Sequence, residues 1–269
     1  MKATVQIDRM YGPAAPENGW VPAPRYLLRR SRILAMTAGI PPGDLLEIGC
    51  GAGMLLQEFA RRGFRCTALE SSAAALNLAQ AFARAANLPI RFCGAPDTDW
   101  RGHFGTVFAF EVLEHIADDQ GALAQWSGWL RSSGHLVISV PAHARLWNAR
   151  DEWAGHYRRY ERAELERLVS EAGLEIESFE CYGFPLANLT ERIGARSYAG
   201  RIRREARHLD ADPRARTDRS GIERGPNVRL YPLQTSFPGR VALAVCLGLQ
   251  RMFLATDLGS GYLLRARPR

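Results

Sequence analysis

Lysine is almost absent from this chain of 269 residues, which has one lysine beside 34 arginines. Such a one-sided choice is more typical of codon usage than of selection for a phosphate-rich partner, so the net charge of +7 does not by itself indicate nucleic acid. The charge is uneven along the chain, because residues 191–229 contain eleven arginines and six acidic residues. We therefore treat this stretch as separate from the main domain.

Cysteine is scarce as well. The five cysteines are an odd number and form no C-x-x-C pair, which argues against a disulfide framework and against a cysteine-based zinc site. We expect reduced, mostly buried thiols and no metal site.

Long apolar runs and targeting segments are also lacking. The uncharged run between Arg240 and Arg251 has ten residues, about half of the roughly 20 that a bilayer-spanning helix needs. The first ten residues, MKATVQIDRM, have no apolar run behind their two basic residues. We therefore expect no transmembrane helix, no signal or transit peptide, and a cytoplasmic protein.

Strand and helix patterns alternate through the first two thirds of the chain. Alternation with short connections produces right-handed βαβ crossovers, so it predicts an α/β fold with a doubly wound, mostly parallel sheet covered by helices on both faces. Seven strands are expected at residues 45–48, 65–70, 90–93, 106–111, 135–140, 175–182 and 261–266, and helices at 54–62, 73–86, 119–130 and 162–172.

Four segments follow from this pattern. Residues 1–40 are expected to form an N-terminal arm with a helix over 22–38, and residues 41–183 the core of the domain. Residues 184–256 interrupt the alternation as an Arg-rich insertion, and residues 257–269 return as the last strand and a tail.

An apolar strand runs directly into three glycines in the sequence LLEIGCGAG, at Gly49, Gly51 and Gly53. Alternate glycines let the backbone turn tightly and approach a ligand without a Cβ clash, and the helix that follows offers free backbone N–H groups. A dinucleotide-binding loop would have its third glycine at the position of Met54. The spacing therefore disfavours a nicotinamide or flavin cofactor and indicates another small ligand.

Two carboxylates belong to the same region of the predicted sheet. Glu47 lies just before the glycines, and Glu70 closes the second strand, where a carboxylate can accept hydrogen bonds from two ribose hydroxyls. This E-x-G-x-G-x-G pattern with its second acid resembles the class I S-adenosylmethionine-dependent methyltransferases, over about two thirds of the chain. The resemblance implies a Rossmann-like methyltransferase fold that binds S-adenosylmethionine. It places Glu47 near the methionine part, the three glycines under the cofactor and Glu70 on the ribose.

The same family often places an aspartate after the third strand, against the adenine amino group. Asp97 is our candidate for that role, and Asp99 is the alternative. Either residue could instead start a turn.

The fourth strand ends in the sequence FAFEVLEHI, with Glu111 next to the cleft where ligands bind in open α/β sheets. EVLEHI resembles the methyltransferase branch that includes ubiquinone-biosynthesis enzymes, and it differs from the N-P-P-Y motif of enzymes that methylate nucleic-acid amino groups. We expect Glu111 to line the methionine end of the cofactor. His115 is a candidate general base, because a neutral imidazole can accept a hydroxyl proton near neutral pH. The alternative is that His115 caps or packs the next helix.

The loop after the fifth strand, PAHARLWNARDEWAGHYRRYERAEL, is richer in aromatic and ionisable residues than a connection requires. Loops at this edge of the sheet carry function. His156 and Tyr157 are therefore candidate catalytic residues, and further candidates for acceptor contacts are His143, Trp147, Trp153, Arg159 and Tyr160. The equal alternative is that these side chains only fix the loop in place.

The resemblance implies transfer of a sulfonium methyl group, and we expect the acceptor to be an oxygen on a small or lipid- or saccharide-linked molecule. Methylation at carbon stays open. Positioning and exclusion of water can supply most of the rate of such a reaction. The alternatives are an RNA-binding protein or RNA methyltransferase that uses the Arg-rich insertion, and a membrane-surface module that binds S-adenosylmethionine. Nucleic acid is the less favoured partner, because the insertion lacks the regular aromatic residues of a single-strand platform.

The insertion is expected to be a mobile, partly helical cover over the acceptor pocket, since both of its ends are anchored near one edge of the sheet. Residues 210–232 read as its loop. The apolar run Val241–Leu254 has Val245, Leu249 and Met252 at helical spacing, which predicts a helix that docks through these side chains. An Arg-rich cover would favour an anionic acceptor, although simple solvated charge is an equal alternative. Peripheral membrane contact also stays open.

Overall fold

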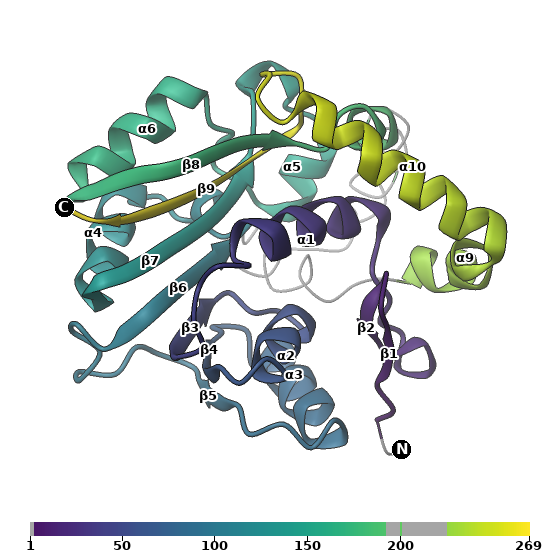
Figure 1. Cartoon of the computed structure of the whole chain (residues 1–269), viewed down its shortest axis with the longest axis horizontal. Helices are drawn as coiled ribbons and strands as arrows, with labels where there is room; N and C mark the ends of the chain where they lie inside the picture. Colours follow the sequence, from purple (N-terminus) through teal and green to yellow (C-terminus); the bar gives the residue numbers. More distant parts are fainter. Residues whose placement is uncertain (1–2, 192–199, 201–224) are drawn as a thin grey trace.

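The structure, a computed structural model, describes residues 3–191, 200 and 225–269 of the chain. A seven-stranded sheet forms its centre, with the strand order β5-β4-β3-β6-β7-β9-β8 (Figure 1). β9 runs antiparallel to both of its neighbours, and the other strand pairs are parallel. The strands are β3 (Asp44–Ile48), β4 (Arg65–Leu69), β5 (Arg91–Cys93), β6 (Phe104–Phe110), β7 (Leu130–Pro141), β8 (Leu174–Tyr182) and β9 (Gly261–Pro268). The predicted doubly wound α/β sheet is confirmed.

Helices cover both faces of this sheet. The side chains of β6 alternate between two cores, because successive residues of a strand point to opposite faces. Val107 and Ala109 pack with α4 and α6, whereas Phe108 and Phe110 pack with α1 and α2. The helices are α1 (Pro24–Met36), α2 (Met54–Ala60), α3 (Ala73–Ala85), α4 (Asp119–Trp129), α5 (Ala149–Ala154), α6 (Arg162–Glu171), α9 (Gly225–Thr235) and α10 (Phe237–Phe253), with 3-10 turns at Pro16–Asn18, Leu113–His115 and Ala144–Leu146.

Capping residues stabilise the starts of two of the predicted helices. The Ser72 hydroxyl accepts a hydrogen bond from the backbone of α3, and the Asp118 carboxylate does so for α4. Among the predicted strands, the largest difference is at β7, which begins at Leu130 and not at His135. Its first residues pair with β6 across a register irregularity, which hides the strand period in the sequence.

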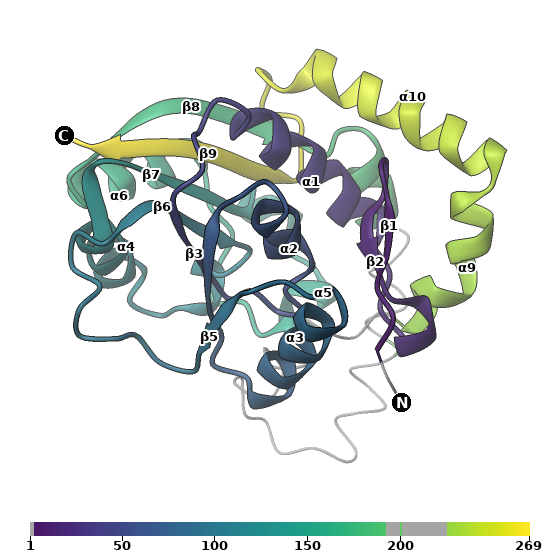
Figure 2. The same ribbon diagram turned by 60° about the horizontal axis from the view of Figure 1, so that its bottom comes forward.

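The N-terminal arm forms a two-stranded sheet of β1 (Gln6–Asp8) and β2 (Gly12–Ala14), and the end of the insertion packs beside it (Figure 2). Tyr231 of α9 is buried with Val21 and Ala14. Residues 225–232, which we predicted as loop, are therefore helical, because burial of an apolar side chain outweighs the helix-breaking tendency of Pro232.

The docking face of α10 is also corrected. Val245, Leu249 and Met252 are exposed, and the helix packs through Leu243 and Gln250. The Gln250 side-chain amide donates to the α1 carbonyl of Leu28 at 3.1 Å. The predicted mobile cover spans residues 184–256, of which 192–199 and 201–224 lie outside the described part of the chain, so its mobility stays a prediction. None of the described helices is long and apolar enough to cross a membrane.

Candidate active site

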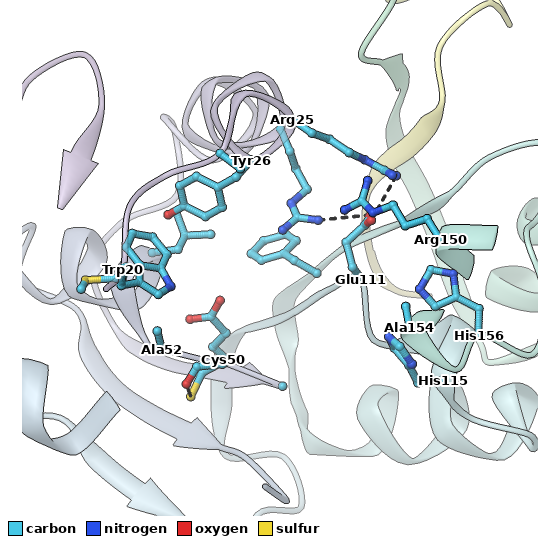
Figure 3. A pocket seen from close by; sticks show the side chains of 18 of the residues that line it. Trp20, Arg25, Tyr26, Cys50, Ala52, Glu111, His115, Arg150, Ala154 and His156 are labelled. Atoms are coloured by element: carbon cyan, nitrogen blue, oxygen red, sulfur yellow. Dashed lines mark hydrogen bonds and ion pairs between the residues drawn. The ribbon is translucent and has the colours of Figure 1, made fainter. Parts of the chain in front are cut away.

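A pocket opens between α1 and the carboxyl ends of β3 and β6, where the strand order of the sheet reverses. Ligands bind at this position in open α/β sheets. Cys50 and Ala52 of the glycine loop lie on one side of the pocket, and His115 and His156 lie on the other (Figure 3). Other side chains that line it are Trp20, Arg25, Tyr26, Arg29, Glu47, Glu111, Arg150, Asp151 and Trp153.

All three glycines of the loop have left-handed backbone, with φ values of +65° at Gly49, +54° at Gly51 and +68° at Gly53. A Cβ atom on Gly49 would lie 2.6 Å from the side chain of Val112. Larger residues are therefore excluded by conformation and, at Gly49, also by space. The loop presents bare backbone to the pocket through Gly49 and Gly51, as the sequence analysis predicted.

Glu70 holds the glycine loop in place through a hydrogen bond to its backbone. One carboxylate oxygen accepts a hydrogen bond from the Gly51 backbone N–H at 2.8 Å, and the other accepts one from the Ser72 N–H at 2.9 Å. Glu70 is not among the residues that line the pocket, so its expected contact with a ribose stays a prediction.

Glu47 is buried in β3 and lines the pocket. One of its carboxylate oxygens has no hydrogen-bond partner among the described residues. Burial raises the pKa of Glu47 to about 8, with a further rise from the nearby Glu70 and a decrease from Arg29. An unpartnered buried carboxyl group beside bare glycine backbone fits a ligand that brings both a hydrogen-bond donor and a positive charge.

Asp97 lies outside the pocket. Its exposed carboxylate forms an ion pair with Arg91 at 2.8 Å and accepts a hydrogen bond from the Thr98 N–H. Asp99 is exposed as well and does not line the pocket. The structure therefore does not bring either aspartate to the other predicted site residues.

Glu111 follows β6 with a left-handed φ of +57° and lines the pocket, and its expected place at the methionine end of the cofactor stays a prediction. Its carboxylate lies 3.2 Å from the Arg25 guanidinium and 3.3 Å from that of Arg29, and the Tyr182 hydroxyl donates to it at 3.0 Å. Burial alone would raise the pKa of Glu111, but the two guanidinium groups hold it well below its usual range. This carboxylate is therefore ionised and anchors α1 over the pocket.

Arg25 and Arg29 are site residues that were not predicted from the sequence. Both are largely buried and line the pocket from α1. Their i, i+4 spacing places both arginines on one face of the helix, the face that meets the sheet. This spacing is the feature of the sequence from which their role in the site could have been predicted.

His156 is held by a chain of buried polar groups. Its Nδ1 lies 2.9 Å from the Asp151 carboxylate, which also accepts hydrogen bonds from Arg159 at 2.9 and 2.8 Å. Burial alone would raise the pKa of Asp151, but the bonds from His156 and Arg159 lower it to about 2. An ionised Asp151 keeps the proton of a neutral His156 on Nδ1, so that Nε2 is the proton acceptor.

His115 lies beside His156, with 4.7 Å between the ring centroids. Burial, together with the neighbouring His156, lowers the pKa of His115 to about 4. Glu114 is fully buried, and burial raises its pKa well above the usual range.

Tyr157, the third predicted catalytic residue, does not line the pocket. Its side chain is 53% exposed, and its backbone N–H donates to the carbonyl of Glu114. More than half of the Tyr157 surface is therefore exposed to solvent, and the structure does not bring this residue to the predicted catalytic histidines at the pocket.

Some of the other candidate residues of this loop line the pocket, and others only fix the loop in place. Trp153 lines the pocket, whereas Tyr160 is buried and donates to Asp119 at 3.0 Å. His143 is buried 3.3 Å from Glu161, away from the pocket, and Trp147 is partly exposed. The contacts of His143 and Tyr160 fix the loop in place. Of the candidate residues named for this loop, Trp153 and His156 line the pocket.

Two groups of side chains have the composition of metal ligands. Glu114, His115 and His156 form one, and His143, Cys181 and Asp257 the other, each with ligand atoms within 4.8 Å of one another. Neither group was predicted from the sequence, where the metal expectation rested on cysteine pairs.

The sequence model of a methyltransferase-domain family matches residues 23–178, which are 156 of the 269 residues. The ubiquinone biosynthesis O-methyltransferase of Nitrobacter winogradskyi is 35% identical over 114 residues, 42% of each protein. The enzyme of the same name from Chromobacterium violaceum is 26% identical over 164 residues, 55% of this chain and 71% of that one. The chain thus spans less than half the length of the first of these relatives.

Solved structures share the fold at low identity. The cyclase SpnF is 19% identical with a TM-score of 0.56, over 98% of this chain and 88% of that one. Phosphoethanolamine N-methyltransferase 2 of Haemonchus contortus, solved with S-adenosylmethionine, is 16% identical with a TM-score of 0.53, over 90% of this chain and 52% of that one. Because the family match covers more than half of the chain and the sheet has the expected order, the protein belongs to the methyltransferase-domain family that uses S-adenosylmethionine.

Proposed function

We propose that this chain transfers the methyl group of S-adenosylmethionine to an oxygen atom of a small-molecule acceptor. The observation that carries the proposal is that the Asp151–His156 pair faces the same pocket as the glycine loop. The names of the curated relatives, ubiquinone biosynthesis O-methyltransferases, support oxygen as the methylated atom.

Glu47, Gly49 and Gly51 would hold the cofactor, with Glu70 fixing the loop through Gly51. Glu111 would line its methionine end. When bound, S-adenosylmethionine supplies a methyl group on an activated sulfonium. The bare backbone and the buried carboxyl of Glu47 then position the cofactor and exclude water, which favours an in-line transfer.

We assign proton transfer to His156 in place of His115. Since Asp151 holds the proton on Nδ1, His156 Nε2 can take the proton of an acceptor hydroxyl as the new oxygen–carbon bond forms. A base with a pKa of about 4, such as His115, has little tendency to take that proton at neutral pH. We therefore give His115 a packing role against His156.

The acceptor itself is tested with labelled S-adenosylmethionine. Purified protein is incubated with a small-molecule extract, a lipid extract or RNA, and incorporation of the label is measured. Label in the small-molecule or lipid fraction supports the proposal. Label in RNA alone, with no label in the small-molecule and lipid fractions, would contradict the proposal and support the alternative of an RNA methyltransferase.

The assignment of the base is tested with two matched variants. His156→Asn should lower kcat by about 10²-fold or more with little change in the affinity for S-adenosylhomocysteine, because the proton acceptor is lost and the cofactor contacts are kept. His115→Asn should lower kcat by less than about tenfold. If the two effects are reversed in folded proteins, His115 is the base.

Arg150 supports the expectation of an anionic acceptor. It lines the pocket on the side of His156, and a guanidinium group donates well to a carboxylate or phosphate. The contribution of Arg150 is measured with pairs of acceptors that differ only in one acidic group. The charged acceptor should have the lower KM, and Arg150→Gln should remove this difference in KM.

A further inference from the structure

The outward side of α9 and α10 exposes large apolar side chains along its whole length. Phe237 is 80% exposed and Met252 is 74% exposed. The full set, which we call the α9–α10 apolar face, consists of Leu230, Leu233, Phe237, Val241, Val245, Leu249 and Met252. Single exposed apolar side chains are common, but a set of seven large ones on two consecutive helices indicates a binding surface.

α10 is apolar on both sides. Its inner side packs Leu243 against Tyr11 and Leu27, and its outer side carries the apolar face. A helix that is apolar all round is normally covered on all sides. Both views show α10 along the outside of the described molecule, with no described element packed over it (Figures 1 and 2).

The charges around this face are of one sign. Residues 225–256 contain no aspartate or glutamate, and Arg229 and Arg251 are exposed beside the apolar side chains. Arg240 is more buried and pairs with Asp8. An apolar surface bordered by arginines is complementary to the apolar interior and anionic headgroups of a membrane surface.

We propose that the α9–α10 apolar face docks this protein on a bilayer that contains anionic lipids. α10 has 17 residues, a length of about 26 Å, and is too short and not apolar enough to span. It would lie in the plane of the interface with Phe237, Val245 and Met252 inserted below the headgroups. The inference stands on this surface and does not depend on the proposed function.

A second copy of the chain fits the face less well. In a symmetric dimer the same surface patch is used on both subunits. Arg229 and Arg251 of each copy would then lie at the edge of one interface. Because the face contains no acidic residue to pair with them, these like charges would repel one another.

Sedimentation with vesicles tests the proposal. The full chain is mixed with vesicles of phosphatidylcholine alone or of phosphatidylcholine with phosphatidylglycerol, at low and at physiological salt. We expect binding to the anionic vesicles to be at least about tenfold tighter than to the neutral ones, and to weaken with salt.

Substitutions on the face supply the second arm. Phe237→Ser combined with Met252→Ser should weaken vesicle binding about tenfold or more, because less apolar area is inserted. The matched control is Ile7→Ser, which removes a side chain that is 58% exposed on β1 and should leave binding unchanged. Circular dichroism and the affinity for S-adenosylhomocysteine show that each variant is folded.

Three results would overturn the proposal. The first is a wild-type protein that stays in the supernatant with anionic vesicles at low salt. The second is equal binding by the wild type and the double variant. The third is a wild-type dimer in light scattering that the double variant converts to a monomer, since the occupant of the face would then be a second copy.

Discussion

Asp151→Asn tests the buried polar chain on which the proposed base depends. The Asp151 carboxylate is 1% exposed and accepts hydrogen bonds from His156 and from two nitrogens of Arg159, whose side chain is also buried. Asparagine keeps the shape of the side chain but removes the charge and half of its acceptor capacity. A decrease of the Asp151 pKa from 3.8 to about 2 corresponds to about 2 kcal/mol of stability. The shift already contains the bonds from Arg159, which keeps Glu191 as a second partner at 3.5 Å, so we expect Asp151→Asn to cost about 2 kcal/mol.

The sign of the pH dependence follows from the direction of the shift. The pKa of Asp151 is lower in the folded than in the unfolded protein, so its stabilisation is fully present above pH 3.8 and is lost as the pH falls through about 2. The difference between wild type and Asp151→Asn should therefore be constant from pH 5 to 8 and shrink towards acid.

Urea unfolding at pH 7 and pH 3, followed by circular dichroism, measures this difference. The matched control is Asp97→Asn, because the Asp97–Arg91 pair is exposed and should contribute less than about 1 kcal/mol. The reasoning is refuted if Asp151→Asn costs no more than this control at pH 7, or if its cost grows at pH 3.

Two further predictions concern the carboxylates of the cofactor site. Glu70→Ala should weaken S-adenosylhomocysteine binding by about 1 to 3 kcal/mol in calorimetry, because the Gly51 and Ser72 N–H groups lose their acceptor; undiminished binding would show that Glu70 does not support the loop. For Glu47, a folded pKa of about 8 against 4.5 in the unfolded chain means that ionisation favours unfolding, so stability falls as the pH rises between these values. Glu47→Gln should flatten this fall in urea unfolding from pH 5 to 9, and an equally steep fall in the variant would place the titrating group elsewhere.

Features fixed by local sequence were predictable. The glycine loop needed left-handed backbone at alternate residues, and the observed φ values at Gly49, Gly51 and Gly53 match that reason. The strand ends of β3 and β4 were also correct within a residue, since buried parallel strands read as short apolar runs between turn signals.

Features that depend on packing were not predictable. The ion pairs of Glu111 with Arg25 and Arg29 join residues more than 80 positions apart, and they form because α1 crosses the carboxyl edge of the sheet. The prediction that α10 docks through Val245, Leu249 and Met252 was wrong, because the helix is apolar on both sides. Periodicity alone could not tell that Leu243 packs inward while Val245 is exposed.

The central claim is that S-adenosylmethionine binds on the glycine loop of this pocket. Isothermal titration of S-adenosylhomocysteine into the wild type and into Gly51→Val tests it most directly, because valine adds a branched side chain where the backbone has a φ of +54° and lines the pocket. We predict a dissociation constant of micromolar order for the wild type and binding at least about 100-fold weaker for a folded Gly51→Val. No binding to the wild type, or equal binding to both proteins, would contradict the account.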